Sequence, residues 1–291
     1  MAGRRNSGDR HDGRRLRSLG GFFNLIPFIM PDRNDALVYF DQALEISSAE
    51  RWFKRQRADG YKGMGMLYLI IAAYVRCVAA FPALNRFVVG RRVYAHEDIV
   101  VNMAVKRSLS LEAEETVIKV RFDPSDTVYD VYRKMNKAIE DARAAGDNND
   151  TDSIADKLGK LPKPILRFVM FIIRVLDNIG LLPRKLLDAS PFHGSMIITD
   201  LGSLGIGPVY HHIYNFGTLP VFISFGAKRK AYEITGEGKV AERKYVDARF
   251  AVDERIVDGY CLASAFKLMQ QYISEPTLLE IPPEVVKRDV R

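Results

Sequence analysis

Residues 253–259 of the 291-residue chain read Asp-Glu-Arg-Ile-Val-Asp-Gly, and this stretch decides the fold. It follows a segment that we expect to be a strand, Glu242 to Val252, and it opens a final amphipathic segment. The apolar residues of that last segment recur on one helical face: Leu262, Ala265, Phe266, Met269 and Ile273. Pro276 ends the helix, because the residue before a proline is disfavoured in the helical conformation. The stretch is therefore predicted to be the turn between a strand and the last helix.

Three further segments stand ahead of this turn. A helix is expected from Met66, and it closes with the phrase Ala-Phe-Pro-Ala-Leu-Asn at residues 80–85. A strand is expected at Ile99 to Val105. A second strand and its turn are expected at residues 194–202, which read Gly-Ser-Met-Ile-Ile-Thr-Asp-Leu-Gly. One short motif is weak evidence, so the interpretation depends on all four segments and on their order along the chain.

Together these segments resemble the catalytic domain of the dihydrolipoyl acyltransferases of 2-oxo acid dehydrogenase complexes. That family carries D-H-R-x-x-D-G at the position of residues 253–259 and G-T-F-T-I-S-N-L-G at the position of residues 194–202. Its chloramphenicol acetyltransferase relatives carry H-x-x-x-D-G. The resemblance covers roughly residues 36–276 and implies an α/β protein with the chloramphenicol acetyltransferase-like layered fold, a mixed sheet covered by helices.

The resemblance also implies roles for four residues. In the family, the serine or threonine at the position of Thr199 donates a hydrogen bond to the oxyanion of the tetrahedral intermediate. Glu254 stands where the family places its general-base histidine. Asp258 and Gly259 match the family pattern, and there the aspartate mainly supports the loop that presents the base. The predicted catalytic set is therefore Thr199 and Glu254, with structural support from Asp258 and Gly259.

A glutamate at the base position changes the chemistry. Proton transfer from a thiol of pKa about 8.5 to a free carboxylate of pKa about 4.3 is uphill by roughly 6 kcal/mol. Burial can raise a carboxylate pKa by about 3–5 units, which closes most of that gap. Glu254 is therefore either a buried base with a raised pKa or no base at all.

His211 and His212 are the alternative source of a base. An imidazole near Thr199 would suit the task, because its pKa lies near neutrality. A metal site is disfavoured, since adjacent histidines in a strand point to opposite faces and no cluster of carboxylates or cysteines accompanies them. We expect no metal.

An amphipathic segment, Pro164 to Leu182, lies within a helical insert at about residues 153–190 that has no counterpart in the resembling family. Its apolar residues share one helical face, and its three charges weigh against a membrane span. Four interpretations remain: cover for the core, an oligomer contact, a wall of an acyl channel with Phe168 and Ile172 as lining candidates, or a helix lying on a membrane. We expect packing within the protein or its oligomer, and peripheral membrane contact is the less favoured alternative.

The composition is that of an ordinary globular protein, 47% hydrophobic and 27% charged. Its two cysteines, Cys77 and Cys261, are too few for a disulfide framework, so a reducing cytoplasm is the expected location. Much of the net charge of +7 comes from arginines within residues 1–20, which we expect to be a disordered basic tail. An apolar arm is expected at residues 21–35, the acyltransferase-like domain at residues 36–276 and a C-terminal tail at residues 277–291.

The remaining pattern alternates strands and helices, which is typical of an α/β layer protein. Strands are expected at Ala36 to Ile46, Val93 to Val105, Thr116 to Phe122, Val221 to Phe225 and Ala231 to Thr235. Met66 to Phe81 is apolar on nearly all sides, which indicates a buried helix, and a half-buried helix is expected from Val128. A loop is expected at residues 146–152.

Two functional classes follow from these observations. The first is an acyltransferase that moves an acyl group between coenzyme A, or a carrier-bound thioester, and a thiol or hydroxyl acceptor. The second is a catalytically inactive family member that serves as an oligomeric scaffold or binds an acyl ligand. The resemblance implies a homo-oligomer, a trimer or a multiple of trimers, with active sites between subunits. We expect acyl-coenzyme A as substrate, no lipoyl group on this chain, a separate carrier or lipoyl protein as partner, and no nucleic-acid partner.

Overall fold

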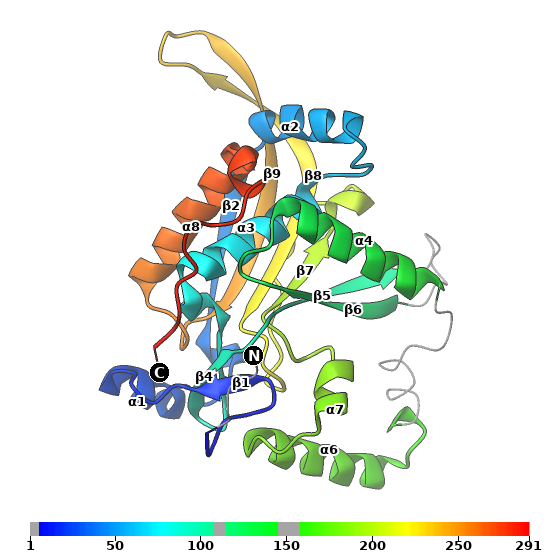
Figure 1. Ribbon diagram of the computed structural model, residues 1–291, viewed down its shortest axis with the longest axis vertical. Coiled ribbons are helices and arrows are strands. Elements are labelled where there is room, and N and C mark those ends of the chain that lie inside the picture. Colours follow the sequence, from blue (N-terminus) through cyan, green and yellow to red (C-terminus); the bar gives the residue numbers. More distant parts are fainter. Residues whose placement is uncertain (1–5, 107–114, 145–157, 291) are drawn as a thin grey trace.

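The computed structural model describes residues 6–106, 115–144 and 158–290, and it contains two β-sheets with helices around them (Figure 1). The larger sheet is mixed: two parallel pairs lie at its centre and antiparallel pairs lie toward both edges. From one edge to the other its strands are β2 (Leu37–Glu45), β9 (Val240–Asp253), β8 (Val221–Ile234), β7 (Met196–Asp200), β5 (Ile99–Lys106) and β6 (Glu115–Phe122).

A smaller sheet corrects two expectations. Its strands are β1 (Gly13–Arg15), β4 (Arg92–His96) and β3 (Arg86–Val89). The single strand expected at residues 93–105 is in fact two strands in different sheets, β4 and β5, which Glu97 and Asp98 separate. The tail expected to be disordered at residues 1–20 pairs with β4 through β1, and Arg10 is 2% exposed. Residues 1–5 lie outside the described part of the chain.

Helices cover one face of the larger sheet. These helices are α2 (Ser47–Ala58), α3 (Met66–Ala80), α4 (Val128–Ala144) and α8 (Gly259–Ser274). Helix α3 lies between α8 and α4 in Figure 1, and nearly all of its residues are buried, as its uniform apolarity predicts. Alternate residues of each strand, such as Ile198 of β7, Ile223 of β8 and Phe250 of β9, share the main core with these helices.

The residues between them along each strand point to the opposite face, because side chains alternate along a strand. There Phe222 and Ala251 form a small apolar cluster with Ile213 and Leu219. The last two residues belong to the segment at residues 205–219, which joins β7 to β8 and lies on this face. This part of the second face is therefore covered by an irregular segment.

Three further helices lie at one end of the molecule, opposite the tip of the β8–β9 hairpin (Figure 1). The apolar arm expected at residues 21–35 contains α1 (Gly21–Ile29), and the helical insert contains α6 (Lys163–Asn178) and α7 (Arg184–Ala189). The predicted loop at 146–152 and the start of the insert lie outside the described residues. Short 3-10 helices occur at Asn34–Ala36, Pro82–Asn85, Gly202–Leu204 and Pro276–Leu279.

The segment after Pro276 packs against the domain. Lys287 donates its backbone N–H to the carbonyl of Ala79 at 2.9 Å, and Arg86 forms a 2.5 Å ion pair with Asp289. Within the described ranges, every helix is too short or too polar to cross a bilayer.

Candidate functional site

The turn at residues 253–259 is held by a buried ion pair between its first and third residues. Arg255 Nε donates to Asp253 Oδ1 at 2.8 Å, and an Nη atom donates to Oδ2 at 2.7 Å. Both side chains are almost fully buried, at 0% and 2% exposure, and such two-point contacts between guanidinium and carboxylate are geometrically restrictive. Arg33 adds a second contact to Asp253 at 3.4 Å. The backbone on both sides of residue 254 is therefore fixed.

Glu254 lies between these two anchored residues and points the other way. Its backbone N–H donates to the carbonyl of Ala36 at 2.9 Å, while its side chain is exposed. Among the described residues, its carboxylate has no hydrogen-bond or ion-pair partner. In the single chain, Glu254 is therefore an exposed carboxylate and not the buried one that was expected of a base.

Asp258 supports the turn by capping the helix that follows it. Its Oδ1 accepts a hydrogen bond from the backbone N–H of Cys261 at 2.8 Å, so it is the N-cap of α8. An N-cap aspartate satisfies a free N–H at a helix start and interacts favourably with the helix dipole. Gly259 is the first residue of α8. Both residues therefore serve the entry into the last helix.

Thr199 begins a row of polar residues that crosses four strands on the sheet face opposite the helices. The register pairs Thr199 of β7 with Ser224 of β8, Ser224 with Arg249 of β9, and Arg249 with Asp41 of β2. Because directly paired residues on adjacent strands share a face, all four side chains lie on the same side of the sheet. Thr199 is half-buried, and its hydroxyl has no hydrogen-bond partner among the described residues.

The segment between β7 and β8 is bound over this row. Ser224 Oγ accepts from the backbone N–H of Val209 at 3.1 Å and donates to its carbonyl at 2.5 Å. Arg249 donates to the carbonyl of Pro208 at 2.7 Å, and its guanidinium lies 4.5 Å from the ring centroid of Tyr210. These contacts hold the covering segment against the sheet beside Thr199.

His211 contacts the sheet face that carries Thr199. The His211 ring stacks on Phe222 with 4.5 Å between centroids, and Phe222 pairs with Ile197, two residues before Thr199 on the same face. The His212 ring stacks on the outer side of His211 and is exposed. His211 is thus the histidine of the pair that lies nearer the threonine.

Thr199 and Glu254 do not meet within one chain. The register places Thr199 of β7 directly across the sheet from Arg249 of β9, with β8 between them. Glu254 follows Arg249 by five residues in the sequence and lies beyond the end of β9. At about 3.3 Å per residue and about 4.8 Å between strands, the offset is roughly 15–20 Å. A site that contains both side chains therefore requires Glu254 from one copy and Thr199 from another.

The two acyl-channel candidates lie on α6, away from this row. Phe168 is 65% exposed and Ile172 is 39% exposed in the single chain. Both point outward from the insert, so they do not line a channel within this chain.

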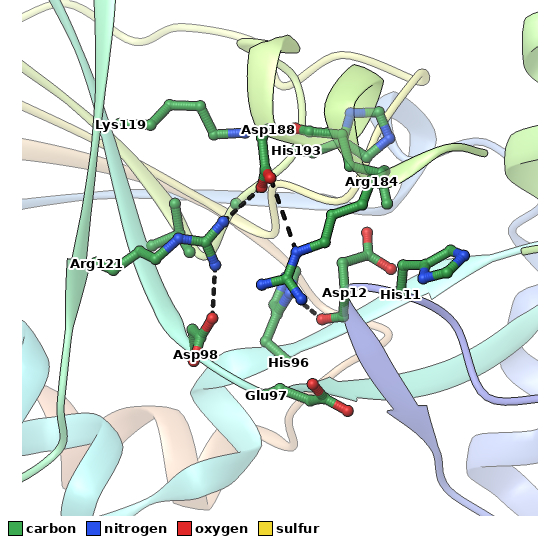
Figure 2. Close-up of a pocket in the computed structure, with 13 residues that line it drawn as sticks. His11, Asp12, His96, Glu97, Asp98, Lys119, Arg121, Arg184, Asp188 and His193 are labelled. Atoms are coloured by element: carbon green, nitrogen blue, oxygen red, sulfur yellow. Dashed lines mark hydrogen bonds and ion pairs between the residues drawn. The ribbon is translucent and has the colours of Figure 1, made fainter. Parts of the chain in front are cut away.

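A second group of chemically active side chains lines a small cavity of about 50 Å³ beside the start of β7 (Figure 2). Arg121 lies between Asp98 and Asp188, with ion pairs of 2.6 and 2.5 Å. Lys119 donates to the carbonyls of Leu187 and Ser190, and burial lowers its pKa to about 8. The cavity is therefore crossed by ion pairs that satisfy its charges internally.

The wall of this cavity continues into a buried network around Arg10. Arg10 forms ion pairs with Asp12 at 2.8 Å and with Asp177 at 2.6 Å. Burial alone would raise the pKa of Asp177, but the hydrogen bond from His193 and the charge of Arg10 hold that pKa below its usual range. His96, whose Nδ1 lies 3.3 Å from the carbonyl of Asp12, has its pKa lowered to about 4 by burial. These contacts join β1, β4 and the end of α6.

No cluster of three metal-ligating side chains occurs within the described ranges. The motifs in the sequence identified Thr199 and Glu254, but they did not identify Ser224, Arg249 and Asp41. Those three residues become neighbours of Thr199 only through strand register, and a single sequence does not show register. The burial of Arg10 was missed because one of its two carboxylate partners, Asp177, is remote in sequence.

No model of a known family matches the chain, and no curated protein matches it in sequence. Solved structures do share its fold. The dihydrolipoamide acetyltransferase of Azotobacter vinelandii, studied for the role of a serine, a histidine and an asparagine in its catalytic mechanism, superposes with a TM-score of 0.57 at 14% identity, over 91% of this chain and 94% of the other.

Two more structures agree. The cubic core of a pyruvate dehydrogenase multienzyme complex superposes with a TM-score of 0.56 at 15% identity, over 91% of this chain and 94% of the other. A chloramphenicol acetyltransferase superposes with a TM-score of 0.52 at 12% identity, over 90% of this chain and 99% of the other. These likenesses confirm the expected fold, a mixed sheet covered by helices.

Proposed function

We propose that this chain, which has the fold of the dihydrolipoamide acetyltransferases and of chloramphenicol acetyltransferase, is itself an acyltransferase. It would move an acyl group between coenzyme A, or a carrier-bound thioester, and a thiol or hydroxyl acceptor. It would act as a homotrimer or a multiple of trimers. The free state of Cys77 and Cys261 supports a reducing cytoplasm as its location.

The observation that carries the proposal is the outward direction of Glu254 from a rigid turn. The buried Asp253–Arg255 ion pair fixes the backbone on either side, and Glu254 alone in that turn presents an unpaired carboxylate. Exact positioning of an unpartnered charged group on a rigid element favours a functional role over a solvated surface role. Because Thr199 of the same chain is remote, Glu254 would act together with Thr199 of a neighbouring copy.

Each residue has a definite task in such a site. The Thr199 hydroxyl would donate a hydrogen bond to the oxyanion that forms when the acceptor attacks the thioester carbonyl. The neighbouring copy's Glu254 would take the proton from the attacking group, and enclosure between two copies would supply the burial that raises its pKa. The histidine and asparagine of the Azotobacter enzyme are four residues apart, as are Glu254 and Asp258, which supports the assignment of Glu254 to the base position.

A second candidate function rests on a different observation. Glu254 is a carboxylate with no partner that buries it in the single chain, and an exposed carboxylate is a poor base for a thiol. An exposed Glu254 is equally consistent with a catalytically inactive protein that acts as an oligomeric scaffold or binds an acyl ligand. His211 offers a third route, an acyltransferase whose base lies in the same chain as Thr199.

Release of free thiol from a series of acyl-coenzyme A substrates separates these possibilities. The proposal expects activity in the parent protein and a loss of about 100-fold or more in Glu254→Gln, since general-base catalysis contributes about 10²–10⁴-fold. Glu237→Gln is the matched control, because Glu237 lies at the exposed tip of the β8–β9 hairpin, where its side chain is 78% exposed.

Three outcomes are informative. Equal activity of the parent and Glu254→Gln would remove Glu254 from the mechanism, and a loss in His211→Gln would then assign the base to that histidine. No activity in the parent, with activity gained in Glu254→His, would establish the inactive scaffold. No activity in any of the proteins with any acyl chain would overturn the acyltransferase assignment.

A further inference from the structure

Helix α6 presents an exposed apolar face that its own chain does not cover. Five apolar residues of the helix and its C-cap residue are at least 39% exposed: Ile165, Phe168, Phe171, Ile172, Val175 and the C-cap Ile179. Asp177 alone in the helix is buried, so α6 touches the rest of the protein mainly at its C-terminal end. An apolar patch of this kind marks a contact with a partner or a membrane rather than with water.

Helix α1 presents a second face of the same kind. Phe22, Leu25, Phe28 and Ile29 are between 54% and 69% exposed, and they recur at helical spacing on one side. Pro27 is the buried residue of this helix. Both helices thus turn exposed apolar residues outward.

The β3–β4 turn brings the two helices together. A β-carbon at Gly90 would lie 2.6 Å from the carbonyl oxygen of Asn178, the last residue of α6. At the next position, the guanidinium of Arg91 lies 5.6 Å from the ring centroid of Phe28 in α1. Figure 1 places both helices at the same end of the molecule. The two apolar faces therefore flank one turn and belong to one end surface.

The charges on this surface are mostly positive. Lys163, Arg167 and Arg174 of α6 are exposed, and Arg91 is exposed in the turn. The acidic residue of α6, Asp177, is buried against Arg10, and α1 contains no acidic residue. Asp32 and Asp35 follow α1 and lie beyond its last residue. A basic rim beside an apolar face is the pattern of a helix that lies in a membrane interface.

We propose that α1 and α6 together lie on the surface of a bilayer that contains anionic lipids. The exposed phenylalanines and aliphatic residues enter the boundary between headgroups and acyl chains, while Arg91, Arg167 and Arg174 contact lipid phosphates. A second copy of the chain fits this face less well, because it would bring the basic residues of two α6 helices close together. The contact leaves the sheet row at Thr199 free, so it is independent of the proposed acyl transfer.

The anchoring of α6 gives this surface its rigidity. Arg10 donates to the carboxylate of Asp177, and His193 lies 3.3 Å from the same oxygen. Together with the close approach of Gly90 to Asn178, these contacts fix the C-terminal end of α6 beside the turn. The helix is therefore held in place before it meets a membrane, and little order has to be gained on binding.

Co-flotation of the full chain with vesicles tests the proposal. Vesicles of phosphatidylcholine alone are compared with vesicles that also contain phosphatidylglycerol. We expect binding to the anionic vesicles and about tenfold weaker partitioning for each phenylalanine replaced in Phe168→Ser and Phe171→Ser. Each charge removed in Arg167→Gln and Arg174→Gln should weaken partitioning about fivefold. Added salt should act in the same direction as the arginine variants.

The matched control is Tyr232→Ser combined with Ile234→Ser, because both residues are more than 70% exposed but lie in the hairpin at the opposite end. This control should bind vesicles like the parent. Circular dichroism and thermal unfolding establish that each variant is folded. No flotation with anionic vesicles would overturn the proposal, as would equal losses in the control. A smaller particle by light scattering in the phenylalanine variants, without vesicles, would instead make this face an interface between copies and would also overturn it.

Discussion

Arg10 and Asp177 are 167 residues apart in the sequence, and they form a buried ion pair of 2.6 Å between Nη2 and Oδ1. The pair joins the segment before β1 to the end of α6. It has a second carboxylate partner in Asp12 and a neighbouring imidazole in His193. A segment with the composition of a solvated tail is thereby a structural part of the domain.

The first prediction concerns this ion pair. Arg10→Met should lower the free energy of unfolding by about 3–5 kcal/mol, because it leaves Asp177 buried without its guanidinium partner. Arg10→Met combined with Asp177→Leu should cost less than Arg10→Met alone, since the double change removes both charges. Urea unfolding at neutral pH measures both values. Lys239→Met is the control, because its partner Glu237 is 78% exposed and such a pair contributes about 0–1 kcal/mol. Equal effects of Arg10→Met and Lys239→Met would contradict the anchoring role.

The second prediction concerns pH. Burial lowers the pKa of His96 to about 4, against about 6.5 in the unfolded chain. Between these two values the unfolded chain binds a proton that the folded protein does not bind, so stability decreases as the pH falls from 6.5 to 4. The full effect is about 3 kcal/mol. His96→Gln should remove this part of the pH dependence even where it lowers stability at all pH values.

Unfolding curves at a series of pH values across this window check the prediction. The depressed pKa of Asp177 acts in the same direction, but its stabilisation is lost below the usual carboxylate range rather than between pH 6.5 and 4. The two effects therefore occupy different windows. An unchanged slope in His96→Gln above pH 4.5 would show that this imidazole is accessible to protons in the folded protein.

The third prediction concerns Gly217. Its φ is +91°, and a β-carbon there would lie 2.0 Å from the carbonyl oxygen of Phe192. Gly217→Ala should therefore lower the free energy of unfolding by about 2–4 kcal/mol, through backbone strain and displacement of the neighbouring chain. Gly238→Ala is a close control, because its φ is +77° but nothing lies within 4 Å of the added carbon. That control should cost about 1 kcal/mol. Similar costs for both variants would mean that residues 192 and 217 are not in contact.

The fourth prediction follows from the offset between Thr199 and Glu254. Under the proposed function, Thr199→Val and Glu254→Gln should each have little activity alone. Refolding or co-expressing the two variants together should restore activity, because some sites then combine an intact threonine with an intact glutamate from another copy. Random assembly of equal amounts gives about one quarter of the parental number of sites. A mixture that stays as inactive as its components would place the reacting groups within one chain.

Local patterns predicted much of the fold. The strand at Met196–Asp200 and the buried helix from Met66 follow from runs of apolar residues, which depend only on neighbours in the sequence. The single strand expected at residues 93–105 was wrong because two polar residues, Glu97 and Asp98, mark a change of sheet. That change depends on how β4 pairs with β1, which no local pattern reports.

The candidate site was predictable only in part. The motifs led to Thr199 and Glu254, but the row that Thr199 forms with Ser224 and Arg249 depends on strand register. The burial of Arg10 was missed because a charged residue is buried only with a partner, and Asp177 lies far away in the sequence. The cluster of arginines within residues 1–20 therefore indicated a solvated tail, whereas in the folded chain Arg10 is buried against carboxylates.

The position of Glu254 at the far end of β9 from the Thr199 row has a kinetic consequence. If the reacting groups come from different copies, the rate per chain depends on total protein concentration. Dilution should separate the copies and abolish turnover while each chain stays folded. An assay at very low enzyme concentration would then detect no activity, although every chain is intact.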